Sequence, residues 1–122
     1  MSEEYKILVV DDDAFAAELT GITLESAGYD VVLAEGGIDA LEKIADDPLI
    51  RIVVSDMNMP MVSGVELFEE IRKLGMVQPF VLLTGEEAES LKNAYPAIDA
   101  VIAKDEQFQD VLPQLIERLL AR

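Results

Sequence analysis

Short apolar runs alternate with longer segments of mixed polarity along the whole chain. Each of the longer segments has apolar residues at three- or four-residue spacing, as on one face of a helix. The short runs are continuous, which is typical of strands buried on both faces of a parallel sheet. They cover residues 7–10, 31–34, 52–55, 80–83 and 100–103. The pattern predicts five strand–helix units in succession.

The first helical segment has recognisable ends. Asp13 occupies the position of an N-cap, and Gly28 follows as a C-terminal stop. The apolar residues of this segment are Phe15, Leu19 and Ile22, which share one helical face. We therefore expect a helix that packs through these residues.

Similar signals delimit the other helices. Ser63 and Glu66 form a capping-box pattern that starts the third helix, and Pro113 fits the fifth if Asp110 is its N-cap. Glu86 opens the fourth helix, which has the weakest apolar face. The apolar positions are Ile38, Leu41 and Ile44 or Ala45 in the second helix, Leu67, Phe68, Ile71 and Leu74 in the third, Ala88, Leu91 and Tyr95 in the fourth, and Val111, Leu112, Leu115, Ile116, Leu119 and Leu120 in the fifth.

Strand starts are separated by 20 to 28 residues, which is enough for a crossover helix between parallel strands. Right-handed crossovers with helices on both faces produce a doubly wound α/β sheet. Ligands of such sheets bind beyond the carboxyl ends of the strands. The chemistry of this chain is therefore expected at its strand ends.

Length and composition predict one domain over residues 1–122. The chain has 51% hydrophobic residues, which can fill a single core. It has no cysteine and no histidine, which excludes a disulfide framework, a thiolate zinc site and a phosphohistidine within this chain. Nine basic against 25 acidic residues give a net charge of −16, so we expect no direct binding to nucleic acid.

No apolar run approaches the ~20 residues that cross a bilayer. The first five residues are acidic where a signal peptide would be basic. We therefore expect a soluble cytoplasmic protein without a membrane partner.

Four of the five predicted strand ends carry candidate functional side chains. Asp11 and Asp12 follow the first, Asp56 the third, Thr84 the fourth and Lys104 the fifth. Oxygen ligands without histidine or cysteine favour a hard cation that keeps some of its water, which indicates Mg²⁺. A lysine and a hydroxyl beside Mg²⁺ can hold phosphoryl oxygens while a carboxylate attacks phosphorus.

These residues, in this order and spacing, resemble a response-regulator receiver domain of two-component signalling. The resemblance covers nearly the whole chain and includes the pattern Asp56-x-x-Met59-Pro60-x-x-x-Gly64. It implies a flavodoxin-like (βα)5 fold with strand order 2-1-3-4-5. It also implies a phosphohistidine donor on a sensor kinase or phosphotransfer protein, an unidentified downstream protein, and a monomer or weak phosphorylation-dependent dimer.

The resemblance assigns roles to the acidic residues. Asp56 is the implied phosphoacceptor. Asp12, Asp56 and the main-chain carbonyl of Asn58 are implied to hold Mg²⁺, with Asp11 acting through water. Asn58 and Glu86 are expected to border the path of the water that hydrolyses the acyl phosphate. Apart from this self-catalysed transfer and slow dephosphorylation, no enzyme activity is expected.

Thr84 and Lys104 are implied to bind the new phosphoryl oxygens. Two departures from the family pattern concern this part of the site. Lys104 is followed by Asp105 and Glu106, where the family usually has proline and an aromatic residue. Val101 stands where the family often has the ring that moves with the threonine. Switching by an aromatic rotamer is therefore not expected.

Two alternatives remain open. A phosphatase resembling the haloacid dehalogenase type would use an Asp-x-Asp motif within Asp11-Asp12-Asp13, with Asp11 as its nucleophile and with Thr84 and Lys104. This alternative leaves Asp56 and its Met-Pro loop unexplained. A receiver that has become a constitutive docking module would explain the altered turn after Lys104. Labelling of Asp56 by a phosphodonor distinguishes these functions.

Overall fold

A sheet of five parallel strands runs through the centre of the molecule in the order β2-β1-β3-β4-β5. The computed structural model describes residues 5–85 and 87–121. The strands are β1 (Lys6–Val10), β2 (Asp30–Ala34), β3 (Ile50–Asp56), β4 (Phe80–Thr84) and β5 (Ala100–Ala103). The predicted doubly wound fold and the implied strand order are confirmed.

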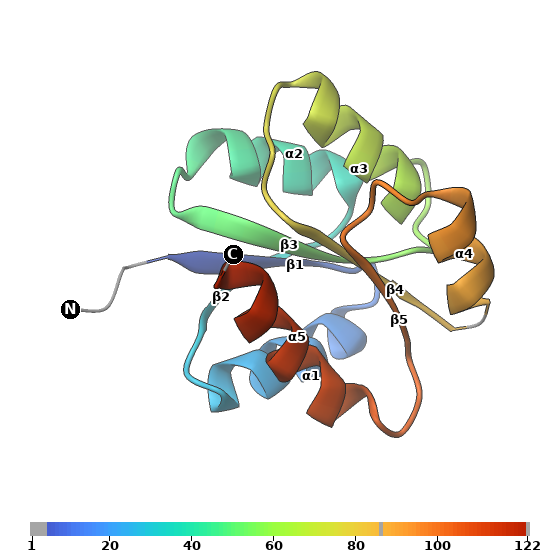
Figure 1. Cartoon of the computed structure of the whole chain (residues 1–122). Coiled ribbons are helices and arrows are strands. Elements are labelled where there is room, and N and C mark those ends of the chain that lie inside the picture. Colours follow the sequence, from blue (N-terminus) through green and yellow to red (C-terminus); the bar gives the residue numbers. More distant parts are fainter. Residues whose placement is uncertain (1–4, 86, 122) are drawn as a thin grey trace.

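Five helices follow the strands and cover both faces of the sheet. They are α1 (Ala14–Ser26), α2 (Gly37–Asp46), α3 (Gly64–Lys73), α4 (Ala88–Ala94) and α5 (Phe108–Leu120). Figure 1 shows α1 and α5 on one face and α2 and α3 on the other. Across residues 5–85 and 87–121, no helix has the length and apolarity that crossing a bilayer requires.

Alternate strand residues fill two apolar cores. Ile7 and Val9 of β1 face the α1 and α5 side, whereas Leu8 and Val10 face the α2 and α3 side. All four are fully or almost fully buried. Because helices cover both faces, the strands have continuous apolar runs rather than alternating polarity.

The expected packing face of α1 is wrong. Phe15, Leu19 and Ile22 are 76%, 41% and 59% exposed. The helix lies so close to β2 that a Cβ on Gly21 would be 3.3 Å from Cδ2 of Leu33. A large side chain does not fit at the position of Gly21. The buried residues of the helix are Ala17, Thr20, Gly21 and Leu24.

The predicted N-cap of α5 is also wrong. The helix begins at Phe108, so Asp110 lies within its first turn and Pro113 within the helix itself. Pro113 has no N–H to donate to the carbonyl of the preceding turn. Burial of Phe108 and Leu112 in the same core accounts for the earlier start, because it places two apolar side chains one turn apart on the packed face.

The fourth helix, α4, is the least buried helix of the described chain. It contains no buried residue, and Leu91 and Tyr95 are only partly buried against the core. Glu87, at its N-cap position, has a left-handed backbone conformation with a φ of 58°. The weak apolar face predicted for this helix is confirmed.

Candidate functional site

Three carboxylates lie together at the carboxyl edge of the sheet. Asp11 and Asp12 follow β1 directly, and Asp56 is the last residue of β3. One carboxylate oxygen from each of the three lies within 4.8 Å of the other two. Asp11 and Asp56 are only 5% and 9% exposed, whereas Asp12 is exposed. The order β1-β3 in the sheet accounts for this cluster, since neighbouring parallel strands end side by side.

Lys104 reaches this cluster from the edge strand of the sheet. Its main-chain N–H donates to the carbonyl of Thr84 at 2.8 Å, which fixes it at the end of β4. Its Nζ lies 2.7 Å from Oδ1 of Asp56 and 3.3 Å from Oδ2 of Asp11. Because β4 lies between β5 and β3, a side chain as long as lysine is needed to span that distance.

Burial raises the pKa of Asp56 above its ordinary value, because the ionised carboxylate loses hydration. The hydrogen bond and positive charge of Lys104 oppose this rise in pKa. The negative charges of Asp11 and Asp12 add to it. The net pKa of Asp56 is raised, and burial rather than repulsion by the neighbouring carboxylates is the main cause.

Burial also acts on Lys104, where it lowers the pKa of the ammonium group. The hydrogen bonds and negative charges of Asp56 and Asp11 outweigh this effect, and the net pKa of Lys104 is raised. Lys104 is therefore a permanent positive charge directly beside the Asp56 carboxylate.

The main chain around Asp56 is tightly held. The buried hydroxyl of Ser55 donates to the carbonyl of Asp56 at 2.9 Å. The next residue, Met57, donates to Leu83 at 2.8 Å and accepts from Gly64 at 2.9 Å. A Cβ on Gly64 would lie 2.5 Å from the Asp56 carbonyl oxygen, so only glycine allows this approach. The hydrogen bond of Ser55 could not be predicted from the sequence, because a serine within a strand has no single typical hydrogen-bond partner.

The other predicted site residues take different positions. Thr84 is buried at the last position of β4, next to the strand end that carries Asp56. Asn58 lies two residues beyond Asp56 and is exposed. Val101 pairs in register with Leu82 and is partly buried against the core. Glu86, expected near the hydrolytic water, lies outside the described residues.

The carboxylate cluster fits a hard divalent cation. Its ligands are oxygen atoms only, which suits Mg²⁺ or Ca²⁺ rather than the metals that prefer nitrogen or sulfur. Two of its carboxylates are nearly buried and one is exposed, so an ion held there would keep access to water. The site therefore combines three carboxylates that could hold a metal ion with a lysine that contacts two of them.

Comparison with known proteins gives a consistent result. Residues 7–116 match the response regulator receiver domain family. The chain is 35% identical over 109 residues to a transcriptional regulatory protein CpxR homolog of Haemophilus influenzae, covering 89% of this chain and 43% of that protein. It is 36% identical over 119 residues to the response regulator MprA of Mycobacterium ulcerans, covering 96% and 47%. The chain thus spans less than half the length of these curated relatives.

Solved structures agree with this result. The response regulator TrrA of Thermotoga maritima, solved in complex with Mg²⁺ and BeF, superposes with a TM-score of 0.84 at 33% identity, covering 94% of this chain and 98% of that one. The chemotaxis protein CheY4 of Vibrio cholerae gives a TM-score of 0.82 at 28% identity, covering 96% of this chain and 99% of that one. Sequence and fold lead to the same conclusion: this chain belongs to the response regulator receiver domain family of two-component systems.

Proposed function

We propose that Asp56 is the phosphoacceptor of this receiver domain and takes its phosphoryl group from a phosphohistidine on a sensor kinase or phosphotransfer protein. The observation that supports it best is the carboxylate of Asp56, nearly buried and 2.7 Å from the Nζ of Lys104. The test is incubation with acetyl phosphate and Mg²⁺, followed by intact-mass measurement and peptide mapping. One added phosphoryl group on Asp56 is the expected result.

The chain's own residues divide the transfer between them. An ionised oxygen of Asp56 attacks phosphorus, the P–N bond of the phosphohistidine breaks, and its electron pair returns to the imidazole. Lys104 is positioned to bind an equatorial phosphoryl oxygen as negative charge shifts during transfer. Thr84, at the neighbouring strand end, offers its hydroxyl to the product. Hydrolysis of the acyl phosphate restores the Asp56 carboxylate.

The proposed metal is Mg²⁺. Asp12, Asp56 and the main-chain carbonyl of Asn58 would hold it, with Asp11 acting through water. When bound, the ion would neutralise charge on the phosphoryl oxygens, which the nearby carboxylates would otherwise repel. The T. maritima regulator TrrA was solved with Mg²⁺ and BeF, which supports the same ion here.

The exposed face of α1 is the proposed docking surface for the phosphodonor protein. The helix starts beside the carboxylate cluster, since Asp13 caps it and its N–H also donates to Asp11. Phe15, Leu19 and Ile22 form an exposed apolar stripe on the outer face of α1. A phosphohistidine that reaches Asp56 must approach along this edge, so its carrier protein meets the stripe.

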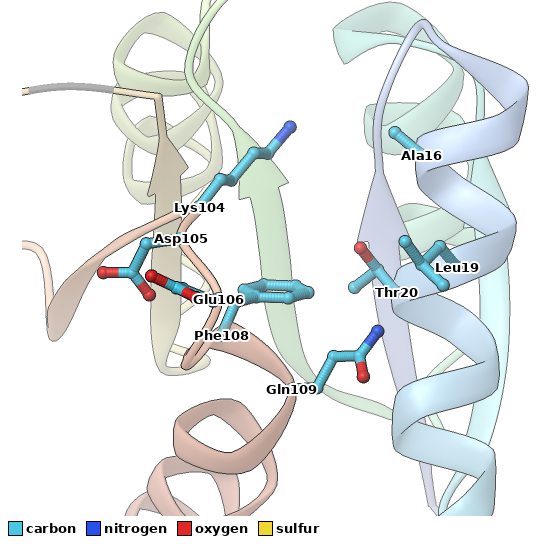
Figure 2. A pocket seen from close by; sticks show the side chains of 8 residues that line it. All are labelled: Ala16, Leu19, Thr20, Lys104, Asp105, Glu106, Phe108 and Gln109. Carbon is cyan, nitrogen blue, oxygen red and sulfur yellow. The ribbon is translucent and has the colours of Figure 1, made fainter.

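A hollow of about 350 Å³ adjoins the stripe and supports this assignment. Leu19 and Thr20 line it from α1, and Phe108 and Gln109 line it from α5 (Figure 2). Lys104 lies at its rim, with the ammonium group directed away from Phe108 (Figure 2). An apolar side chain of a docking helix fits such a hollow, close to the transfer site.

The docking surface predicts a change in one reaction only. Phe15→Ser should slow transfer from a phosphorylated histidine phosphotransfer domain by about tenfold, because a central apolar contact is worth roughly 1–2 kcal/mol. Labelling by acetyl phosphate should stay unchanged. Val77→Ser is the matched control, since Val77 is 82% exposed but lies before β4, at the opposite edge of the sheet. Equal transfer rates for Phe15→Ser and Val77→Ser would rule out this docking surface.

The proposed output runs through Thr84 and α4. A phosphoryl group on Asp56 can draw the Thr84 hydroxyl inward and move the connection that begins at Gly85. The fourth helix has no buried residue, so little free energy opposes its displacement. Val101 supplies no ring to follow the threonine, so the backbone or another side chain takes up the change.

Nuclear magnetic resonance tests this output. Beryllofluoride with Mg²⁺, used as a phosphoryl analogue, should shift the backbone amide signals of residues 84–95 and 101–105. Thr84→Ala should weaken the response, because the hydroxyl that couples the two regions is lost. Shifts confined to the immediate neighbours of Asp56 would favour the docking-module alternative instead.

The setting of this activity is also a proposal. Residues 1–122 would act as one cytoplasmic receiver domain, as a monomer or a weak dimer that depends on phosphorylation. The downstream partner is another protein, since a net charge of −16 opposes direct contact with nucleic acid.

A further inference from the structure

The connection between β5 and α5 follows directly on Lys104, and Asp105 is its first residue. Oδ1 of Asp105 accepts a hydrogen bond from the main-chain N–H of Gln107 at 2.9 Å. The N–H of Asp105 donates to Ala103 at 3.0 Å, and its carbonyl accepts from Phe108 at 3.1 Å. Asp105 thus contributes its side chain and both of its main-chain groups to the turn.

This turn joins two anchored points. On the strand side, the N–H of Lys104 donates to the carbonyl of Thr84 at 2.8 Å. On the helix side, Phe108 is only 8% exposed and packs in the core with the rest of α5. Gln107, at the N-cap position of α5, makes no side-chain capping bond. The carboxylate of Asp105 is therefore the side chain that fixes the path between the two anchors.

The path of the turn matters because of what Lys104 does. Its Nζ contacts Asp56 at 2.7 Å and Asp11 at 3.3 Å, and both contacts depend on where its main chain lies. Exposed connections are usually mobile unless hydrogen bonds hold them. A displacement of about 1 Å in a positioning group can change a reaction rate by about 10²-fold.

We infer that Asp105 is the positioning residue of Lys104. Its side-chain oxygen, acting as an acceptor for the N–H of Gln107 rather than as a negative charge, holds the turn that keeps the ammonium group at Asp56. The inference rests on the proposed phosphotransfer to Asp56. Asp105 itself contacts none of the atoms that react in this transfer.

Four proteins separate the acceptor from the charge: wild type, Asp105→Ala, Asp105→Asn and Glu106→Ala. Asparagine keeps a side-chain oxygen that can accept from Gln107 and removes the charge. Glu106→Ala removes a neighbouring charge whose side chain forms no hydrogen bond within the described part of the chain. With acetyl phosphate and Mg²⁺, the labelling rate should fall about tenfold in Asp105→Ala and stay within about twofold of wild type in the other two variants.

Amide hydrogen exchange of the metal-free proteins gives a second measurement that needs no phosphotransfer. The N–H groups of Gln107 and Lys104 should exchange faster in Asp105→Ala, and Asp105→Asn should restore wild-type exchange. If wild type is not labelled, the proposed function fails, and the exchange rates alone then decide the role of Asp105. If wild type is labelled but Asp105→Ala reacts equally fast, or Asp105→Asn is as slow as Asp105→Ala, the inference is overturned.

Discussion

Asp56→Asn is expected to abolish the phosphoryl label that the wild-type domain acquires from acetyl phosphate and Mg²⁺. The carboxamide has nearly the same shape, but it has no anionic oxygen that can attack phosphorus. The fold should survive, since the substitution removes a charge from a nearly buried position. Intact-mass spectrometry of matched samples should therefore show full labelling for wild type and no stable label for the variant.

Two further variants make this result specific. Asp11→Asn tests the phosphatase alternative, in which Asp11 rather than Asp56 would carry the phosphoryl group. Asp110→Asn is the control for loss of a carboxylate, because Asp110 is exposed on α5. A label that persists in Asp56→Asn and disappears in Asp11→Asn would show the phosphatase reaction and contradict the receiver mechanism proposed here.

Mg²⁺ is expected to raise the free energy of unfolding by ~2.7 kcal/mol at a free concentration of ~100 times its dissociation constant. For a chain of this size the melting temperature should rise by about 10 °C. The physical reason is the cluster of three carboxylates, in which one oxygen of each lies within 4.8 Å of the other two. The ammonium group of Lys104 contacts only two of these carboxylates, so negative charge remains for the metal ion to neutralise. Thermal unfolding with Mg²⁺ and with NaCl at matched ionic strength separates metal binding from screening.

Asp12→Asn should change this balance in both directions. Without metal it removes one repelling charge, and the melting temperature should rise by about 2 °C, because an exposed charge is worth only ~0.5 kcal/mol. With Mg²⁺ it removes a ligand, so the response to the metal should weaken. If Mg²⁺ leaves the unfolding of the wild-type domain unchanged, this metal site is excluded.

The pH dependence of the metal response follows from Asp56. Burial raises its pKa, so the folded metal-free domain binds this proton more tightly than the unfolded chain. This proton contributes to the free energy of unfolding in full when the pH is below the pKa that Asp56 has in the unfolded chain. The contribution is lost as the pH rises through the higher pKa that Asp56 has in the folded domain. Mg²⁺ binds the ionised carboxylate, and its stabilising effect should therefore increase as pH rises through the same interval.

Most of the fold followed from local sequence signals. Asp13 caps α1 through the N–H groups of Phe15 and Ala16, and the capping box of Ser63 and Glu66 starts α3. Apolar continuity located the strands, and the rule that ligands bind at their carboxyl ends located the site. The sequence could group four site residues, Asp11, Asp12, Asp56 and Lys104. The position of each is set by the strand that it follows, and no distance between elements was needed to predict it.

The features that depend on such distances could not be predicted. Periodicity identified the apolar stripe of α1 but not the close contact between Gly21 of this helix and Leu33 of β2. The start of α5 depends on the burial of Phe108 in the core. A single aromatic residue in the sequence does not predict that it will be buried. Met61 has a left-handed φ of 70°, although methionine is not a residue that favours this conformation.

The stripe of α1 also has a consequence for the colloidal behaviour of the protein. The exposed apolar surface formed by Phe15, Leu19 and Ile22 can also pack against the same surface of a second copy of the chain. The net charge of −16 opposes such encounters, because two like-charged molecules repel before their stripes meet. This protection extends over ~8 Å at physiological ionic strength and shrinks to ~3 Å in 1 M salt. The net negative charge thus keeps the exposed stripes of two copies apart, and concentrated salt weakens that protection.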